Sequence, residues 1–227
     1  MVRGMFNDIA PTYDRLNHIL SLDIDKLWRK RVVRIIRQLG AKHIMDMATG
    51  TGDLAIALAR KIDGSTIYGA DFSSEMLAVA KQKIEHLGLS ERISLTECNA
   101  EDIPLVDEAV DAATVAFGVR NFEHQKEALT EMMRTIRHGG HLVVLEFSNP
   151  RFALVRWCYR LYSHYILPAI GRMVSKHATA YTYLPESIDK FASPEAFTAL
   201  LEEVGFDEVK RKSQSFGIAH IYIAHKA

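Results

Sequence analysis

Apolar positions along the chain follow two alternating patterns, one typical of helices and one typical of buried strands. Residues 23–38 carry a helical stripe that ends near Gly40, and the short apolar run at 43–48 then predicts a strand. The pattern recurs and predicts further strands at 66–70, 93–97, 110–116 and 141–147, with helices at 54–59, 73–86 and 123–136. Towards the C-terminus it predicts a helix at 193–204 and a hairpin of strands near 206–212 and 217–225. Strands that alternate with helices indicate an α/β fold whose mostly parallel sheet has helices on both faces.

Local signals set the expected ends of these elements. Ser73 and Ser193 are predicted N-caps, and Pro194 suits the first turn of the helix that Ser193 begins. Gly139-Gly140 predicts a turn immediately before the fifth strand.

Composition and charge exclude several classes of protein. The 227 residues are 48% hydrophobic, and 28 basic side chains balance 28 acidic ones to a formal net charge of zero. This apolar content excludes an intrinsically disordered chain, and the absence of a basic excess argues against a nucleic-acid binder. Cys98 and Cys158 have no metal-ligand spacing, so we expect a reducing, cytoplasmic compartment and no metal. No apolar run reaches the length of a membrane-spanning helix.

A glycine-rich turn follows the first predicted strand. The sequence from Asp46 to Asp53 reads DMATGTGD, and Gly50 and Gly52 allow a ligand to approach the backbone where a Cβ atom would collide. The spacing fits the pyrophosphate-binding turn of dinucleotide enzymes as well as an S-adenosylmethionine site. Asp53 would repel a pyrophosphate at the helix N-terminus, whereas Asp46 and Asp53 would attract a sulfonium and an ammonium group. The carboxylates therefore favour S-adenosylmethionine.

Polar residues also end the second and third predicted strands. Asp71 follows Gly50 by 21 positions and suits a pair of ribose hydroxyl groups, a role that it would also have in an NAD enzyme. Asn99, Ala100 and Asp102 follow the third strand, where Asn99 or Asp102 would bond the amine of an adenine ring. A helix cap or an ordinary turn explains each residue equally well when it is taken alone. Their position at successive strand ends favours a cofactor crevice.

Several longer motifs resemble those of a known family: MFNDIAPTYDRLN, DMATGTGD, GADFSSEML, NAEDIPL, FGVRNF, GGHLVVLEFSNP and YTYLPESI. With them the chain resembles the ubiquinone/menaquinone biosynthesis C-methyltransferase family, from about Met5 to Gly205. FGVRN and YTYLPESI are more specific than the glycine turn, which many methyltransferases share. The resemblance implies a Rossmann-like class I methyltransferase fold, with a seven-stranded sheet whose last strand is antiparallel.

The resemblance also implies an activity and a division of the chain. S-adenosylmethionine would donate a methyl group to a ring carbon of a prenylated naphthoquinol, converting a demethylmenaquinol to menaquinol. A benzoquinol of the ubiquinone pathway or another small aromatic molecule is the alternative acceptor. The expected units are an N-terminal lid with helices at 1–40 and an S-adenosylmethionine-binding core at 41–147. A substrate and membrane cap follows the fifth strand at 148–192, and a C-terminal helix with a hairpin occupies 193–227.

Transferred position by position, the family's cofactor site falls on Thr51, Asp71 and the pair Asn99-Ala100. Two positions depart from the family's pattern. Ala116 stands where the family often has serine, so a hydroxyl contact is missing there. Ala48 replaces the first glycine of the turn, which is tolerated if its φ angle is negative.

Methylation of a quinol carbon requires a deprotonated ring hydroxyl, which pushes electron density onto the attacking carbon, and a base for the ring proton. Arg120 and Asn121 lie just past the fourth predicted strand, beside the expected position of the methyl group. We expect Arg120 to stabilise the phenolate or to orient a water that acts as the base, with Asn121 fixing it. A salt bridge from Arg120 to Glu123 or Glu146 explains the arginine equally well.

The segment 147–185 contains no acidic residue but many basic and aromatic ones. This favours a cap that accepts a polyprenyl tail, with Tyr165, Tyr181 and Tyr183 as substrate contacts, and that touches anionic lipid headgroups at the inner face of the cell membrane. A core helix with a solvated basic edge is the alternative.

The segment 6–14 precedes the predicted sheet, and we expect it to be a lid over the cofactor, with Tyr13 and Asp14 as contacts. A helix packed on the sheet edge is the alternative. The apolar faces of cap and lid would also suit a homodimer.

Other classes of protein fit less well. An NAD-dependent oxidoreductase is disfavoured by Asp53. A nucleic-acid or protein methyltransferase would carry an (N/D)PP(Y/F) loop after the fourth strand, where this chain has VAFGVRN. The intact glycine turn and FGVRN argue against a non-catalytic scaffold.

Overall fold

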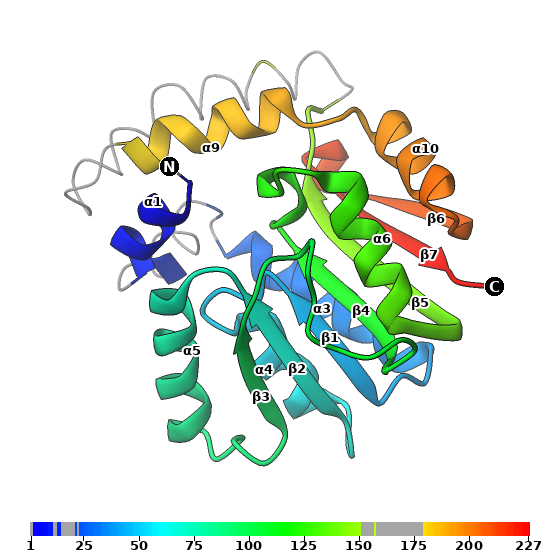
Figure 1. The fold of residues 1–227 in the computed structure, drawn as a ribbon. Helices are drawn as coiled ribbons and strands as arrows, with labels where there is room; N and C mark the ends of the chain where they lie inside the picture. The colour runs from blue at the N-terminus through cyan, green and yellow to red at the C-terminus, as the bar shows by residue number, and fades with distance from the viewer. Residues whose placement is uncertain (1, 11–12, 15–20, 22, 151–156, 158–178) are drawn as a thin grey trace.

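The computed structural model describes residues 2–10, 13–14, 21, 23–150, 157 and 179–227. This part of the chain forms a seven-stranded sheet in the order β3-β2-β1-β4-β5-β7-β6, in which β7 runs antiparallel to the other strands (Figure 1). The strands are β1 His43–Met47, β2 Thr66–Asp71, β3 Ile93–Glu97, β4 Val110–Ala116, β5 Ile136–Phe147, β6 Asp207–Gln214 and β7 Ala219–His225. The predicted fold class is therefore confirmed.

Helices cover both faces of this sheet. The helices are α1 Val2–Ile9, α3 Ile24–Gln38, α4 Asp53–Lys61, α5 Ser74–His86, α6 Gln125–Thr135, α9 Thr179–Lys190 and α10 Pro194–Val204, with short 3₁₀ turns η2 Val119–Asn121 and η4 Ser215–Gly217. One core cluster joins α3, α4 and α5 to one face, and a second joins α6 and α10 to the other. None of the helices in the described residues is both long and apolar enough to cross a bilayer.

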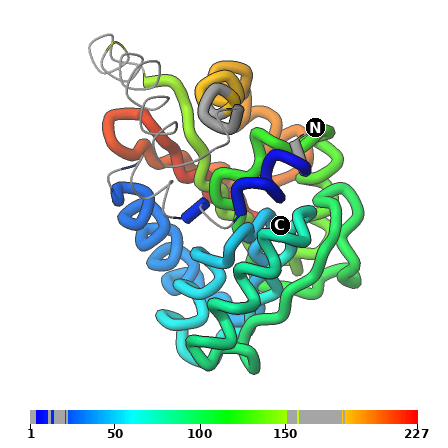
Figure 2. Tube along the Cα trace, turned by 90° about the vertical axis from the view of Figure 1, so that its left-hand side faces the viewer, coloured from blue at the N-terminus to red at the C-terminus, as the bar shows by residue number. Residues whose placement is uncertain are grey.

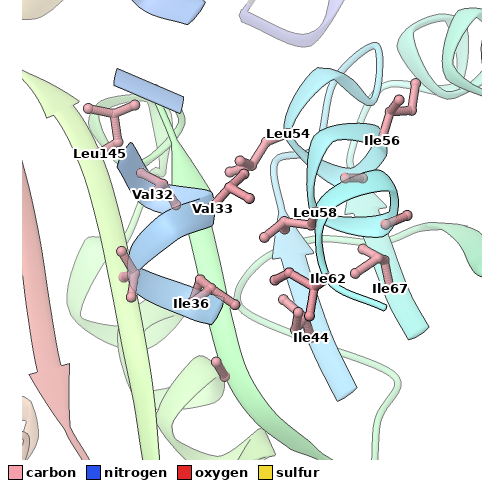
Figure 3. Close-up of a cluster of buried hydrophobic side chains, with 14 of the residues drawn as sticks. Val32, Val33, Ile36, Ile44, Leu54, Ile56, Leu58, Ile62, Ile67 and Leu145 are labelled. Carbon is pink, nitrogen blue, oxygen red and sulfur yellow. The ribbon is translucent and has the colours of Figure 1, made fainter. Parts of the chain in front are cut away.

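The core under α3 shows why the helical stripe at 23–38 forms a helix here. Val33 on α3 faces Leu54 on α4, and Ile36 lies over the sheet close to Ile44 (Figure 3). Val32 and Ile36 are fully buried. Each such aliphatic side chain stabilises the fold by about 1.5–3 kcal/mol relative to an exposed position.

The element ends agree with the sequence except at β5. Ser73 and Ser193 accept the N–H of the third residue of their helices, each at 3.2 Å, as predicted. The turn expected at Gly139-Gly140 is wrong, because β5 begins at Ile136 and runs through both glycines. The N–H of Gly139 donates to the carbonyl of Lys226 at 2.8 Å, and the register against β4 shifts at this point. The glycines mark an irregularity inside a strand, which is their other use in sheets.

The parallel strands β1 to β4 end at one edge of the sheet, and this edge positions the site. Helices α1 and α9 contact each other beside it (Figures 1 and 2). Most of the predicted cap, residues 151–156 and 158–178, lies outside the described residues.

Candidate functional site

A cavity of about 930 Å³ lies at the carboxyl ends of β1 to β4 and extends to α1 and η2. Four of its lining residues are acidic, Asp71, Glu97, Glu101 and Glu123, and no lysine, arginine or histidine is among the described residues that line it. Of the predicted site residues, Tyr13, Gly50, Asp71, Asn99, Ala100, Ala116 and Asn121 line this cavity. Asp46, Thr51, Gly52, Arg120 and Tyr183 are not among the residues described at its wall.

The glycine turn adopts a left-handed backbone at three positions. Gly50 and Gly52 have φ angles of 56° and 82°, and Ala48 has a φ of 54°, so the condition for tolerating alanine at position 48, a negative φ, is not met. A left-handed alanine costs about 1–2 kcal/mol. Gly118, just past β4, lies opposite Ala48, because a Cβ atom there would be 2.5 Å from the Ala48 Cβ. The backbones after β1 and β4 therefore approach each other closely at the cavity.

Asp46 lies beneath the turn and is almost fully buried. It accepts hydrogen bonds from the hydroxyls of Thr49 and Thr114, each at 2.7 Å. Burial raises the pKa of Asp46 to about 6, although both hydrogen bonds act in the opposite direction. Its contact with a cofactor stays a prediction, and the structure shows it holding the turn to β4.

Asp71 joins the end of β2 to the glycine turn. Its two carboxylate oxygens accept the N–H groups of Gly50 at 2.8 Å and Ser73 at 2.9 Å. Burial raises its pKa, and these backbone hydrogen bonds lower it. Each carboxylate oxygen accepts more than one hydrogen bond, so Asp71 can still receive ribose hydroxyls.

The charge of Asp53 is matched by Lys83 on α5. The Lys83 Nζ lies 2.6 Å from Asp53 and 2.7 Å from Asp14, whose carboxylate also accepts the Thr51 hydroxyl. Asp53 therefore has a charged partner within the protein, and its direct action on a cofactor stays a prediction. The same lysine ties the predicted lid to the glycine turn. Local sequence patterns carried no signal for Lys83.

The third strand end contributes a compact turn to the cavity wall. The Asn99 Oδ1 accepts the N–H of Glu101 at 3.3 Å, and the Glu101 carboxylate lies 2.9 Å from His124. Cys98 also lines the cavity. Burial raises the pKa of its thiol to about 11, which keeps the sulfur neutral.

Arg120 forms a buried ion pair with Glu146 on β5. Its Nη1 lies 2.7 Å from Glu146 and 2.6 Å from the carbonyl of Phe117, and its Nε donates to the Ser187 hydroxyl at 3.2 Å. Both charged side chains are at most 5% exposed. The geometry favours the salt-bridge alternative with Glu146, and a direct catalytic role for Arg120 stays a prediction.

Asn121 lines the cavity and is held from α9. The Tyr183 hydroxyl donates to the Asn121 Oδ1 at 2.8 Å, so Tyr183 contacts a wall residue rather than the cavity. Tyr13 lies in the cavity wall with its ring 6.2 Å from that of Phe6. Tyr165 and the side chain of Tyr181 lie outside the described residues.

The composition of the cavity wall is a test of which cofactor fits. A dinucleotide requires donors or positive charge for its pyrophosphate, and this wall has acidic side chains in place of basic ones. S-adenosylmethionine carries a sulfonium and an ammonium group, which such a wall attracts. Gly50 leaves the backbone accessible, and Asp71 is placed for a ribose. The residues present therefore fit S-adenosylmethionine.

A model of the ubiE/COQ5 methyltransferase family matches residues 1–226. The chain belongs to this family. Like the family, it is an S-adenosylmethionine-dependent methyltransferase.

Relatives support this family membership over nearly the full chain. A demethylmenaquinone methyltransferase of Thermus thermophilus is 43% identical and covers 98% of this chain and 100% of its own length. One of Bacteroides fragilis is 40% identical, with 99% of this chain and 92% of the relative covered. The ubiquinone/menaquinone biosynthesis C-methyltransferase UbiE of Geobacter sulfurreducens is 42% identical, with coverage of 99% and 88%.

Solved structures share the fold at low sequence identity. An S-adenosylmethionine-dependent methyltransferase of Aquifex aeolicus aligns with a TM-score of 0.62 at 19% identity, covering 84% of this chain and 87% of that one. The [4+2]-cyclase SpnF aligns with a TM-score of 0.72 at 17% identity, covering 99% and 95%. Since a cyclase shares the architecture, the fold alone does not define the reaction of a family member.

Proposed function

We propose that this chain transfers the methyl group of S-adenosylmethionine to a ring carbon of a demethylmenaquinol, a naphthoquinol with a prenyl tail. One observation carries the proposal: a single cavity of about 930 Å³ extends from Asp71 and Asn99 to Ala116 and Asn121. This volume is at the upper end for ligand sites, so the cavity has room for a cofactor and an aromatic ring together. Relatives named demethylmenaquinone methyltransferase, at 40% and 43% identity, support this acceptor.

When bound, S-adenosylmethionine supplies an electrophilic methyl group. In our proposal, Asn121 receives the quinol oxygen on the acceptor side of the cavity. Its Oδ1 is already occupied by the Tyr183 hydroxyl, so its Nδ2 is the group left to donate a hydrogen bond as charge builds on that oxygen. Arg120 acts indirectly, because its ion pair with Glu146 holds η2, which contains Asn121.

Apolar side chains complete the proposed acceptor side. Phe117 and Phe122 from the β4 connection, Met47 from β1, and Phe6 from α1 line the same cavity. They exclude water from the reacting centre and give the aromatic ring of the acceptor an apolar environment. A prenylated acceptor also implies that the enzyme works as a peripheral protein at the inner face of the membrane.

The test is methyl transfer from labelled S-adenosylmethionine to a short-chain demethylmenaquinol in detergent. We expect a methylated naphthoquinol as the product, with no binding of NADH by calorimetry. The matched comparison is a short-chain benzoquinol, which is the second candidate acceptor because a relative named for both pathways is 42% identical. A higher kcat/KM for the benzoquinol would overturn the naphthoquinol assignment. Cofactor binding with no transfer to either quinol would overturn the proposed reaction.

A further inference from the structure

The exposed charged side chains of α3 are all basic, although the protein as a whole has a net charge of zero. Lys30, Arg31, Arg34 and Arg37 follow one another at helical spacing and are all exposed, while Trp28, Val32 and Ile36 on the opposite side are buried. Among the described residues, no carboxylate lies at ion-pair distance from these four basic side chains. Although basic and acidic residues are equal in number, the basic side chains are concentrated on this part of the surface.

The hairpin extends this surface. Lys212 on β6 pairs directly with Ile221 on β7, and Ile221 belongs to the core cluster under α3. Residues paired across antiparallel strands share a face, so the exposed Lys212 lies on the α3 side of the sheet. Arg31 donates to the side chain of Gln214 at the end of β6, which joins the two elements. We call Lys30, Arg31, Arg34, Arg37 and Lys212 the basic face.

One end of the basic face carries two large exposed apolar side chains. Leu27 on α3 is 53% exposed and Phe216 in η4 is 76% exposed. Each is the chain neighbour of a residue in one hydrogen bond, in which the Trp28 Nε1 on α3 donates to the Ser215 hydroxyl in η4 at 3.1 Å. The Trp28 ring also lies 6.1 Å from that of Phe117, a residue of the cavity wall. The apolar end of the basic face is therefore the end nearest the cavity.

We propose that the basic face, with Leu27 and Phe216, docks the protein on an anionic phospholipid bilayer. Basic side chains beside inserted apolar ones are the arrangement by which peripheral proteins bind such a surface. The inference rests on the proposed function, since a prenylated acceptor dissolves in the bilayer and would reach the cavity from its apolar end. An acidic protein or a nucleic acid would match the positive charge but would leave the two apolar side chains without a partner.

Sedimentation with vesicles tests the docking surface without any substrate. We expect binding to phosphatidylcholine vesicles that contain one quarter phosphatidylglycerol, little binding to pure phosphatidylcholine, and weaker binding as salt rises from about 0.1 to about 0.5 M. Each basic side chain beside an anionic leaflet contributes about fivefold, so the triple variant Lys30→Gln, Arg34→Gln, Lys212→Gln loses about 100-fold in affinity.

The matched control removes the same charge elsewhere, through Arg60→Gln, Lys61→Gln and Lys81→Gln on the exposed sides of α4 and α5. It leaves vesicle affinity unchanged. Phe216→Gly lowers affinity about tenfold even at high salt, and it leaves the fold intact because the residue has a φ of 59°, which glycine adopts freely.

Three outcomes would overturn the docking surface: equal losses in the two triple variants, equal binding to both lipid mixtures, or displacement of the vesicles by duplex DNA. Methyl transfer to the short-chain quinol in detergent is expected to be the same in all these variants. A protein that fails this assay but still binds anionic vesicles refutes the proposed function and leaves the docking surface standing.

Discussion

The two connections that follow the central strands β1 and β4 face each other across the cavity, and they are held in different ways. The turn after β1 is held by nearby strand ends, through Asp46 to Thr114 and Asp71 to Gly50. The connection after β4 is held from further along the chain, by Glu146 on β5 and by Ser187 and Tyr183 on α9. The first is therefore part of the rigid sheet edge, and the second depends on how α9 is seated.

This difference indicates how the site can vary. The strand ends shape the half of the cavity that we assign to the cofactor. The acceptor half depends on α9, which belongs to the segment inserted between β5 and α10. A change in α9 can thus alter the acceptor without disturbing cofactor binding.

Removing the buried arginine is expected to have the largest effect on stability. It also tests whether the connection after β4 can be perturbed without affecting the turn after β1. Arg120→Met leaves the Glu146 charge buried without its partner, which costs about 3–5 kcal/mol of unfolding free energy. Turnover of the quinol falls, while S-adenosylmethionine affinity below the unfolding transition stays close to that of the wild type. Urea unfolding and calorimetry measure the two quantities.

The double variant Arg120→Met, Glu146→Leu is the control, since it removes both charges and recovers part of the lost stability. If cofactor affinity falls in proportion to turnover in the single variant, the two halves of the cavity are not independent. Near-wild-type turnover would exclude any role for Arg120 in the reaction.

A charge is also buried under the first connection, and its response to pH is expected to be the next largest effect. Burial raises the pKa of Asp46 from 3.8 to about 6, so the folded state binds this proton more tightly than the unfolded chain. The stability from this group is fully present below the unfolded pKa and is lost as the pH rises through the folded pKa.

Between about pH 4.5 and 7.5, the wild type is expected to lose about 2 kcal/mol of unfolding free energy relative to Asp46→Asn. Urea titrations of both proteins at the two pH values measure this difference. A difference that is independent of pH would show that Asp46 remains ionised in the fold, and the two connections would then both rest on buried charge.

The close approach of the two connections at Ala48 and Gly118 can be tested directly. Gly118→Ala places a Cβ atom 2.5 Å from the Ala48 Cβ and is expected to cost about 1.5 kcal/mol of stability. Ala48→Gly relieves the left-handed alanine, and in that background the cost of Gly118→Ala falls by at least half. Thermal unfolding of the four proteins gives the coupling, and strictly additive effects would mean that the two backbones move apart freely.

The smallest effect is expected at the hydrogen bond between α9 and η2. Tyr183→Phe removes the donor to the Asn121 Oδ1, so that the amide can rotate, and kcat falls about fivefold. The KM for S-adenosylmethionine stays unchanged, which separates this effect from a general loss of structure. Tyr222→Phe, a buried tyrosine of β7 outside the cavity wall, is the control and leaves kcat unchanged. An equal loss in both variants would remove α9 from the acceptor side.

Most of the fold could be predicted because its signals are local. Periodicity located β3 and β4 at their observed residues, and Ser73 and Ser193 fixed the helix starts through their own side chains. The start of β5 could not be predicted, because Gly139-Gly140 is compatible with a turn or with an irregular strand. The choice depends on the backbone of Lys226, far along the chain.

The site was predictable where a strand end itself carries the residue, as at Asp71 and Asn99. It was not predictable where a side chain depends on a distant partner. Lys83 pairs with Asp53 and Asp14, which lie 30 and 69 positions away in the sequence, and no local pattern predicts this pairing. Glu146 and Glu123 were equal candidates for Arg120 in the sequence, and only the packing of β5 beside β4 distinguishes them.

The strand order has a consequence for how the protein is made. β7 follows β6 in the sequence but lies between β5 and β6, so β6 has no neighbour in the sheet until β7 has been synthesised. On the ribosome, the first five strands can pair as they emerge, whereas the hairpin can join the sheet only after β7 has left the exit tunnel. Until then β5 presents an open edge to other chains, which makes the interval before β7 emerges the period of greatest risk of aggregation.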